Sequence, residues 1–238
     1  MKNWIVSLFC LLGSVLAAGP LAAEVAREVD YEYYDVPAVD WNKLHVEVFS
    51  RSPITGGGKK YAGHANWNLE YSYKTTQPTI GVCRPQNLAV TSRCVITLPR
   101  LKGGDRALHL AFNSYLAKLG DHERRHCQIA VNYGEAFESW FRTLGDQKCE
   151  TLTARIKSKY DQVMEECRSE QKRYDHQTQH GRYEGINLRQ SLRELGIAGS
   201  DQNWGAPKSG LVSLDTDPDD GQDVSGFHQG PDGVWRNY

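Results

Sequence analysis

Residues 105–145 form the part of this chain whose fold is most narrowly constrained. Inward-facing positions recur there every three and four residues, which is the spacing of one face of an α-helix. Asp105 follows two glycines and is a suitable N-cap, and Gly145 is suited to end the helix. The stripe is largely apolar but includes two ionisable residues: Leu119, Glu123, His126, Ala130, Tyr133, Phe137, Trp140 and Leu144. The pattern therefore predicts a long helix with polar groups on its buried face.

A second helix is predicted directly after the first. Its apolar positions share one face and include Leu152, Ile156, Tyr160 and Val163. Only residues 145–148 separate the two helices, and so short a connection indicates an antiparallel helical hairpin. If the hairpin folds about the middle of this connection, Cys167 lies opposite Cys127 and Gln171 lies opposite His122.

The region before the helices has the pattern of β-strands. Trp67, Leu69, Tyr71 and Tyr73 alternate along one face of a predicted strand, and residues 94–98 (CVITL) form another. We expect a small, mostly antiparallel sheet in a β-rich region over residues 24–104. With a helical region over residues 105–195, the fold class is predicted to be α+β.

The two ends of the chain are predicted to lie outside this domain. Residues 1–23 have a basic start, an apolar run and small residues, which is typical of a cleavable signal peptide. Cys10 could mark a lipid anchor, but Phe9 before it is the wrong residue and the apolar run continues past it. Residues 196–238 are rich in Gly, Asp, Pro and Ser, which favours a disordered tail. We therefore expect a periplasmic or secreted protein, and no other apolar run is long enough to span a membrane.

Export changes how the cysteines are interpreted, because disulfides persist in an oxidising compartment. Cys83 and Cys94 flank a turn-rich stretch, and we expect them to pair. Cys127 and Cys167 face each other in the predicted hairpin and form the second expected pair, which leaves Cys149 free. A buried thiol at Cys127 is the alternative.

Residues 122–126 read H-E-R-R-H, and this H-E-x-x-H pattern carries the predicted chemistry. His122 and His126 lie one helical turn apart, so both imidazoles can reach one Zn²⁺ ion. Glu123 is offset from them and can act as general base toward a water molecule beside the ion. A solvated, charged turn is the competing interpretation, but it does not explain why Glu123 and His126 fall on the buried stripe.

The third zinc ligand is left open among three residues. Glu170 falls on the inner face of the second helix, opposite Glu123, while Asp175 and His180 lie just beyond it. Cys127 points about 100° away from His126 around the helix and is a poor ligand. Tyr174 or Tyr183 is a candidate to stabilise an oxyanion. The arginines Arg124 and Arg125 are expected to be solvated rather than to bind substrate.

The pattern H-E-x-x-H, followed after a helical hairpin by Y-D-x-x-T-x-H-G, resembles a bacterial family called domain of unknown function 922. The second motif matches Tyr174, Asp175, Thr178, His180 and Gly181, and the resemblance covers about residues 30–190. Members of that family are inferred from the same motif to be secreted zinc-dependent proteases. The resemblance favours His180 and Asp175 over Glu170 as third ligand and implies a zincin-like helical hairpin. We expect His122, His126 and His180 to bind the zinc ion, with Asp175 and Glu170 as the alternatives to His180.

The predicted function is that of a zinc-dependent hydrolase, a metallopeptidase with a peptide or protein as substrate. Lys and Arg total 28 against 29 Asp and Glu, so the charge balance does not indicate nucleic acid as a partner. One alternative is a non-catalytic cell-envelope protein with a structural or vestigial metal site. A second is a hydrolase of another substrate, such as an amidase acting on cell-wall material.

Overall fold

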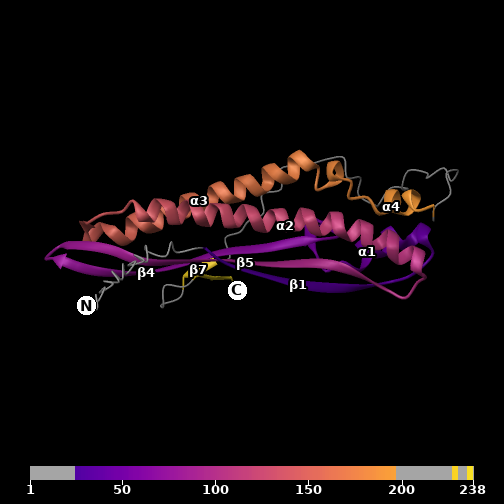
Figure 1. Cartoon of the computed structure of the whole chain (residues 1–238), viewed down its shortest axis with the longest axis horizontal. Coiled ribbons are helices and arrows are strands. Elements are labelled where there is room, and N and C mark those ends of the chain that lie inside the picture. Colours follow the sequence, from indigo (N-terminus) through magenta and orange to yellow (C-terminus); the bar gives the residue numbers. More distant parts are fainter. Residues whose placement is uncertain (1–24, 197–226, 230–234, 238) are drawn as a thin grey trace, which may run out of the picture.

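The computed structural model describes residues 25–196, 227–229 and 235–237. Two long helices, α2 (Arg106–Arg142) and α3 (Cys149–Thr178), lie side by side along most of the molecule (Figure 1). Helix α2 packs on a sheet, and α3 packs on α2. The predicted helical hairpin is therefore confirmed, and it determines the long axis of the protein.

Helix α2 begins where its sequence indicates. Asp105 Oδ1 accepts a hydrogen bond of 2.8 Å from the backbone N–H of Leu108, which satisfies one of the free donors of the first turn. The helix ends at Arg142, a few residues before Gly145. His122, Glu123 and His126 are all among its buried residues, as the stripe predicts for Glu123 and His126.

The sheet is mixed rather than mostly antiparallel. Its central strand is β5 (Val82–Lys102), which pairs with β4 (His64–Thr79) in an antiparallel hairpin. On its other side β5 pairs with β1 (Ala26–Pro37), and this pairing is parallel. Strand β4 makes the parallel pairing of β1 and β5 possible, because it begins near the end of β1 and runs back before β5 starts. The two-residue strand β6 (Gln147–Lys148) pairs with the start of β5.

A helix that the strand pattern did not indicate lies within the N-terminal region. Helix α1 (Trp41–Arg51) buries Leu44 and Val48 on one face, and Asp40 caps its first turn by accepting from Asn42 N. The remaining described elements are short. They are β2 (Thr55–Gly56), β3 (Lys59–Lys60), the 3-10 turn η1 (Arg182–Glu184), α4 (Leu188–Glu194), β7 (Phe227–Gln229) and β8 (Trp235–Asn237).

Two hydrophobic clusters share helix α2. One packs the first half of α2, around Phe112, against the sheet, α1 and α4. The other packs the second half, around Phe137, against β4, β5 and α3. The H-E-x-x-H residues lie between the two clusters, so apolar side chains hold the helix on both sides of them.

Both disulfides differ from the predicted pairs. Cys83 bonds to Cys149, Cys94 bonds to Cys127, and Cys167 is a buried free thiol. Cys83 cannot pair with Cys94 because both lie on strand β5, where eleven residues of extended chain span about 36 Å. Cys127 faces the sheet rather than α3, which brings it to Cys94 instead of Cys167.

These bonds agree with a protein located outside the cytoplasm, because disulfides persist in oxidising compartments. None of the helices that the structure describes combines the length and the apolar character needed to cross a bilayer. The predicted signal peptide over residues 1–23 lies outside the described residues. So does most of the predicted tail over residues 196–238, in which β7 and β8 pair with each other.

Candidate metal centre

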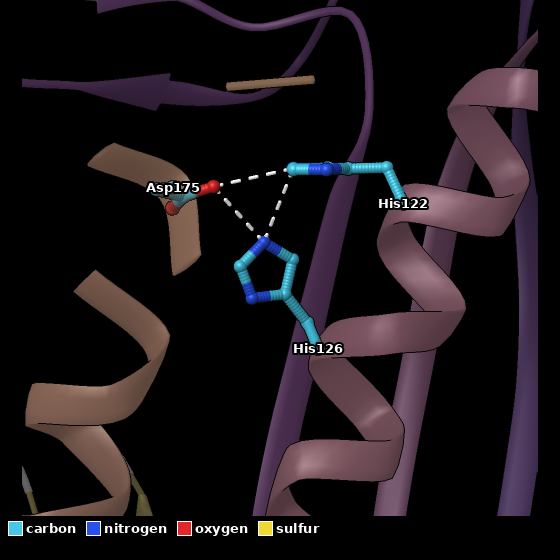
Figure 2. Close-up of side chains that lie close together, drawn as sticks. All are labelled: His122, His126 and Asp175. Atoms are coloured by element: carbon cyan, nitrogen blue, oxygen red, sulfur yellow. Dashed lines mark hydrogen bonds and ion pairs between the residues drawn. The ribbon is translucent and has the colours of Figure 1, made fainter. Parts of the chain in front are cut away.

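Three side chains from two helices converge at one point (Figure 2). His122 and His126 project from successive turns of α2, and Asp175 projects from α3. Asp175 Oδ1 lies 3.2 Å from His122 Nε2 and 3.0 Å from His126 Nε2. The two Nε2 atoms are 3.3 Å apart. The three atoms therefore form a nearly equilateral triangle.

The other ring nitrogen of each histidine is held by an oxygen acceptor. His122 Nδ1 donates to Glu184 Oε2 at 2.7 Å, and His126 Nδ1 donates to Gln171 Oε1. In the tautomer that binds metal, these bonds hold the proton on Nδ1 and leave a lone pair on each Nε2 directed toward Asp175. Without a metal ion, protons on Nε2 allow the two rings to donate to Asp175 instead. Lone pairs at such distances repel one another unless a cation or protons lie among them.

The triangle fits a divalent metal ion such as Zn²⁺. Zinc bonds to imidazole nitrogen and carboxylate oxygen are about 2.0–2.2 Å long, and tetrahedral geometry then separates the ligand atoms by about 3.3 Å. The observed separations are 3.0, 3.2 and 3.3 Å. Two imidazoles and one carboxylate are also a donor set that zinc uses when one coordination position stays open.

The carboxylate on α3 and the two imidazoles on α2 stabilise each other's charged forms across the helix interface. Burial alone would raise the pKa of Asp175, but the hydrogen bonds from His122, His126 and His180 hold it well below its usual value. Burial alone would lower the pKa of both His122 and His126, but their bonds to Asp175 raise it. A carboxylate that stays ionised in a largely buried site is suited to bind a cation.

Glu123 lies beside the triangle with only 5% of its surface exposed. Burial raises the pKa of its carboxyl to about 7, although the charges of His126 and His122 oppose this shift. The carboxylate accepts a hydrogen bond from the backbone N–H of Ala65. Next to it, a Cβ atom on Gly63 would lie 2.8 Å from Glu123 Oε1, so the absence of a side chain at Gly63 leaves room for the carboxylate. Strand β4 and the residues before it therefore position Glu123.

Of the three candidate third ligands, Asp175 alone completes the triangle. His180, the expected ligand, lies at the edge of the triangle instead: its Nδ1 is 3.5 Å from Asp175 Oδ1, and 48% of its side chain is exposed. Glu170 is ion-paired with Arg173 and does not join the cluster. The reason is the register of the hairpin, because Gln171 lies opposite His126 rather than His122. This shift of one helical turn brings Asp175, and not Glu170, to the motif.

The two tyrosines considered for an oxyanion differ in their surroundings. Tyr183 is 69% exposed. The ring of Tyr174 stacks on His122 with centroids 4.8 Å apart, and its hydroxyl donates to Glu184 Oε1 at 2.8 Å. Glu184 therefore bridges Tyr174 and His122, which ties the orientation of the His122 ring to α3 and η1.

Sequence reasoning did not identify Gln171, Glu184 or Gly63 as site residues. Folding the hairpin about its connection places Gln171 near the motif. A polar amide on the inner face of the second helix could therefore have identified Gln171 as a site residue. Glu184 follows the Y-D-x-x-T-x-H-G motif by three residues. No pattern marked Gly63, because its role depends on how β4 passes α2.

Replacing Gln171 with Leu is expected to weaken zinc affinity about 10- to 100-fold, as is typical when a partner of a metal-bound histidine is lost. Gln171 accepts from His126 Nδ1 and donates to His126 O at 2.9 Å, so leucine removes both bonds and frees the ring. Competition with a chromophoric chelator measures the affinity. Gln162→Leu is the matched control, since Gln162 is an exposed glutamine of the same helix bonded to Glu166. Equal affinities of the two variants would contradict the assigned role.

The fold and the site together define a mixed α/β protein in which two long helices present a histidine–carboxylate cluster. Comparison with known families matches residues 31–181 to the family described as bacterial protein of unknown function (DUF922). The chain belongs to this family, which the motifs had indicated. No curated protein and no solved structure matches the chain.

Proposed function

We propose that the protein is a zinc-dependent hydrolase, and specifically a metallopeptidase, in which His122, His126 and Asp175 hold the metal. The observation that supports this most strongly is the triangle of two Nε2 atoms and one carboxylate oxygen, with separations of 3.0–3.3 Å and the carboxyl group of Glu123 beside it. Bound zinc would supply Lewis acidity and lower the pKa of a coordinated water molecule to about 7.

Residues of the chain transfer the proton and orient the two imidazoles. Glu123 accepts a proton from water as the water attacks the carbonyl carbon, and it then passes that proton to the leaving amine. Burial favours this role, because a carboxyl group with a pKa of about 7 exchanges protons readily at neutral pH. Glu184 and Gln171 keep the two imidazoles in the tautomer that binds metal.

A catalytic site is favoured over a purely structural one by the number of donors. Structural zinc sites are closed by four protein ligands, whereas catalytic sites keep one position open. Among the described residues the cluster holds three donors. Cys127, which could have closed the site as a thiolate, is engaged in a disulfide with Cys94. An open fourth position supports hydrolysis.

Metal analysis of the purified mature protein tests the ligand set. We expect about one zinc per chain in the wild type, and loss of most of it in both His126→Ala and Asp175→Ala, because each removes one corner of the triangle. Glu170→Ala is the matched control from the same helix and should keep the zinc. Plasma emission spectrometry after dialysis against a weak chelator gives the stoichiometry.

Two results would count against this proposal. If Asp175→Ala kept its full zinc content and His180→Ala lost zinc, His180 rather than Asp175 would be the third ligand. A wild type that takes up no zinc, while unfolding cooperatively as a folded protein does, would remove the metal from the mechanism altogether.

A further inference from the structure

A cavity of about 530 Å³ opens beside the metal centre and shares His122 with it. Its floor is one face of α2, formed by Lys118, Asp121, His122 and Arg125, which are spaced three, one and three residues apart. Tyr174 of α3 and Glu184 of η1 complete its lining. A substrate that reaches the metal centre can therefore extend a neighbouring group into this cavity.

Most of the charges that line the cavity are already paired within the protein. Asp121 forms an ion pair with Arg124. Glu184 accepts from His122 and from Tyr174, so both of its oxygens are used. Lys118 lies 3.9 Å from Glu194, and its ammonium group lies close to Gly185 at the end of η1.

Arg125 differs from these residues. Its side chain lines the cavity and is exposed, and it makes no hydrogen bond or ion pair with the part of the chain that the structure describes. Its charge reaches Tyr174, whose pKa is raised by burial and by the bond to Glu184 while the positive charge of Arg125 opposes the rise. Among the described residues, the guanidinium is therefore a cation without an anionic partner, and it lines the same cavity as Tyr174.

We propose that this cavity binds a carboxylate group of the substrate, which forms a charged, two-pronged hydrogen-bonded pair with Arg125. A guanidinium presents two parallel N–H donors that match the two oxygens of a carboxylate. This inference rests on the proposed peptidase function and specifies its substrate class, namely peptides with an acidic side chain or a free C-terminus near the cleaved bond.

Paired synthetic peptides test the carboxylate preference without turnover. The zinc-loaded Glu123→Gln variant is titrated in a calorimeter with the hexapeptide Ala-Ala-Phe-Ala-Glu-Ala, with its Gln analogue, and with the C-terminal amide of each. We expect the peptide with the recognised carboxylate to bind about tenfold more tightly than its amide, which is typical of a partly exposed charge-assisted bond. The Glu/Gln and acid/amide pairs distinguish a side-chain carboxylate from a terminal one.

Adding Arg125→Gln should reduce this tenfold preference to less than about twofold, and Arg125→Lys should restore part of it. Arg106→Gln is the matched control and should keep the preference. Arg106 is an exposed arginine of the same helix that lies about 28 Å from Arg125 and outside the cavity. The control separates a local effect from a general loss of positive charge.

The proposal is overturned if no peptide binds, if acid and amide peptides bind equally, or if Arg125→Gln keeps the preference. Failure of hydrolysis is a separate outcome. A wild type that cleaves no peptide but discriminates through Arg125 would refute the peptidase and retain the carboxylate site. A wild type that cleaves acidic and amide peptides equally well would retain the peptidase and refute the carboxylate site.

Discussion

Glu123→Gln is expected to keep its zinc and to hydrolyse peptides about 10³-fold more slowly than the wild type, as is typical when a general base is removed. The amide has nearly the shape of the carboxylate, so it fits the space beside Gly63, but it cannot accept the proton from water. A mixed peptide digest serves as substrate, with cleavage followed by mass spectrometry and zinc measured on the same samples.

Glu135→Gln is the matched control for this experiment. Glu135 belongs to the same helix, but it lies on the surface in an ion pair with Arg27. It should hydrolyse at the wild-type rate. Full activity in Glu123→Gln would show that another group handles the proton, and it would remove the main support for the mechanism.

Removing the Cys83–Cys149 disulfide is expected to lower the free energy of unfolding by about 4 kcal/mol, since the bond closes a loop between residues 66 apart. The double variant Cys83→Ser, Cys149→Ser should nevertheless bind zinc normally, because this bond ties the start of α3 to β5, far along the hairpin from Asp175. Urea unfolding under non-reducing conditions measures the stability.

The other disulfide provides the contrast. Cys127 follows His126 directly and anchors that turn of α2 to strand β5. The variant Cys94→Ser, Cys127→Ser should lose a similar amount of stability, about 3–4 kcal/mol for its shorter loop, and should also bind zinc more weakly. If both double variants lost zinc affinity equally, the anchoring of His126 by the Cys94–Cys127 disulfide would not explain the loss.

The long helix and the position of its motif could be predicted from sequence because both follow from local periodicity. Spacing alone indicated that Glu123 and His126 face inward, and a buried Glu beside two histidines already restricted the chemistry. The residue that completes the triangle depended on how α3 lies against α2. Folding the hairpin about the middle of its connection places Gln171 opposite His122, whereas it lies beside His126. This shift of one turn brings Asp175 to the two histidines, rather than Glu170 or the expected His180.

The disulfides and the parallel strand could not be predicted for a different reason. They depend on which segments distant in sequence become neighbours. Cys83 and Cys94 seemed close because a turn was assumed between them, whereas residues 82–102 are one continuous strand. Helix α1 was missed because its aromatic and β-branched residues resemble strand composition, although Leu44 and Val48 are spaced as on a helix.

The adjacent arginines Arg124 and Arg125 have different surroundings, although the sequence pattern treats them alike. Both were expected to be solvated. Arg124 pairs with Asp121, while Arg125 faces the cavity beside the metal centre without such a partner among the described residues. Because adjacent residues are rotated by about 100° around a helix, two identical side chains in sequence face different surroundings.

Asp175, which completes the triangle, comes from α3 and not from α2. This arrangement has a consequence for how the exported chain reaches its final fold. In the proposed site, two ligands come from α2 and the third from α3, so metal capture would fasten the far end of α3, together with η1 and α4, onto the rest of the molecule. Part of the binding free energy would then serve as folding free energy. Protease resistance of this C-terminal portion would depend on how much zinc the surroundings supply after the chain leaves the cytoplasm.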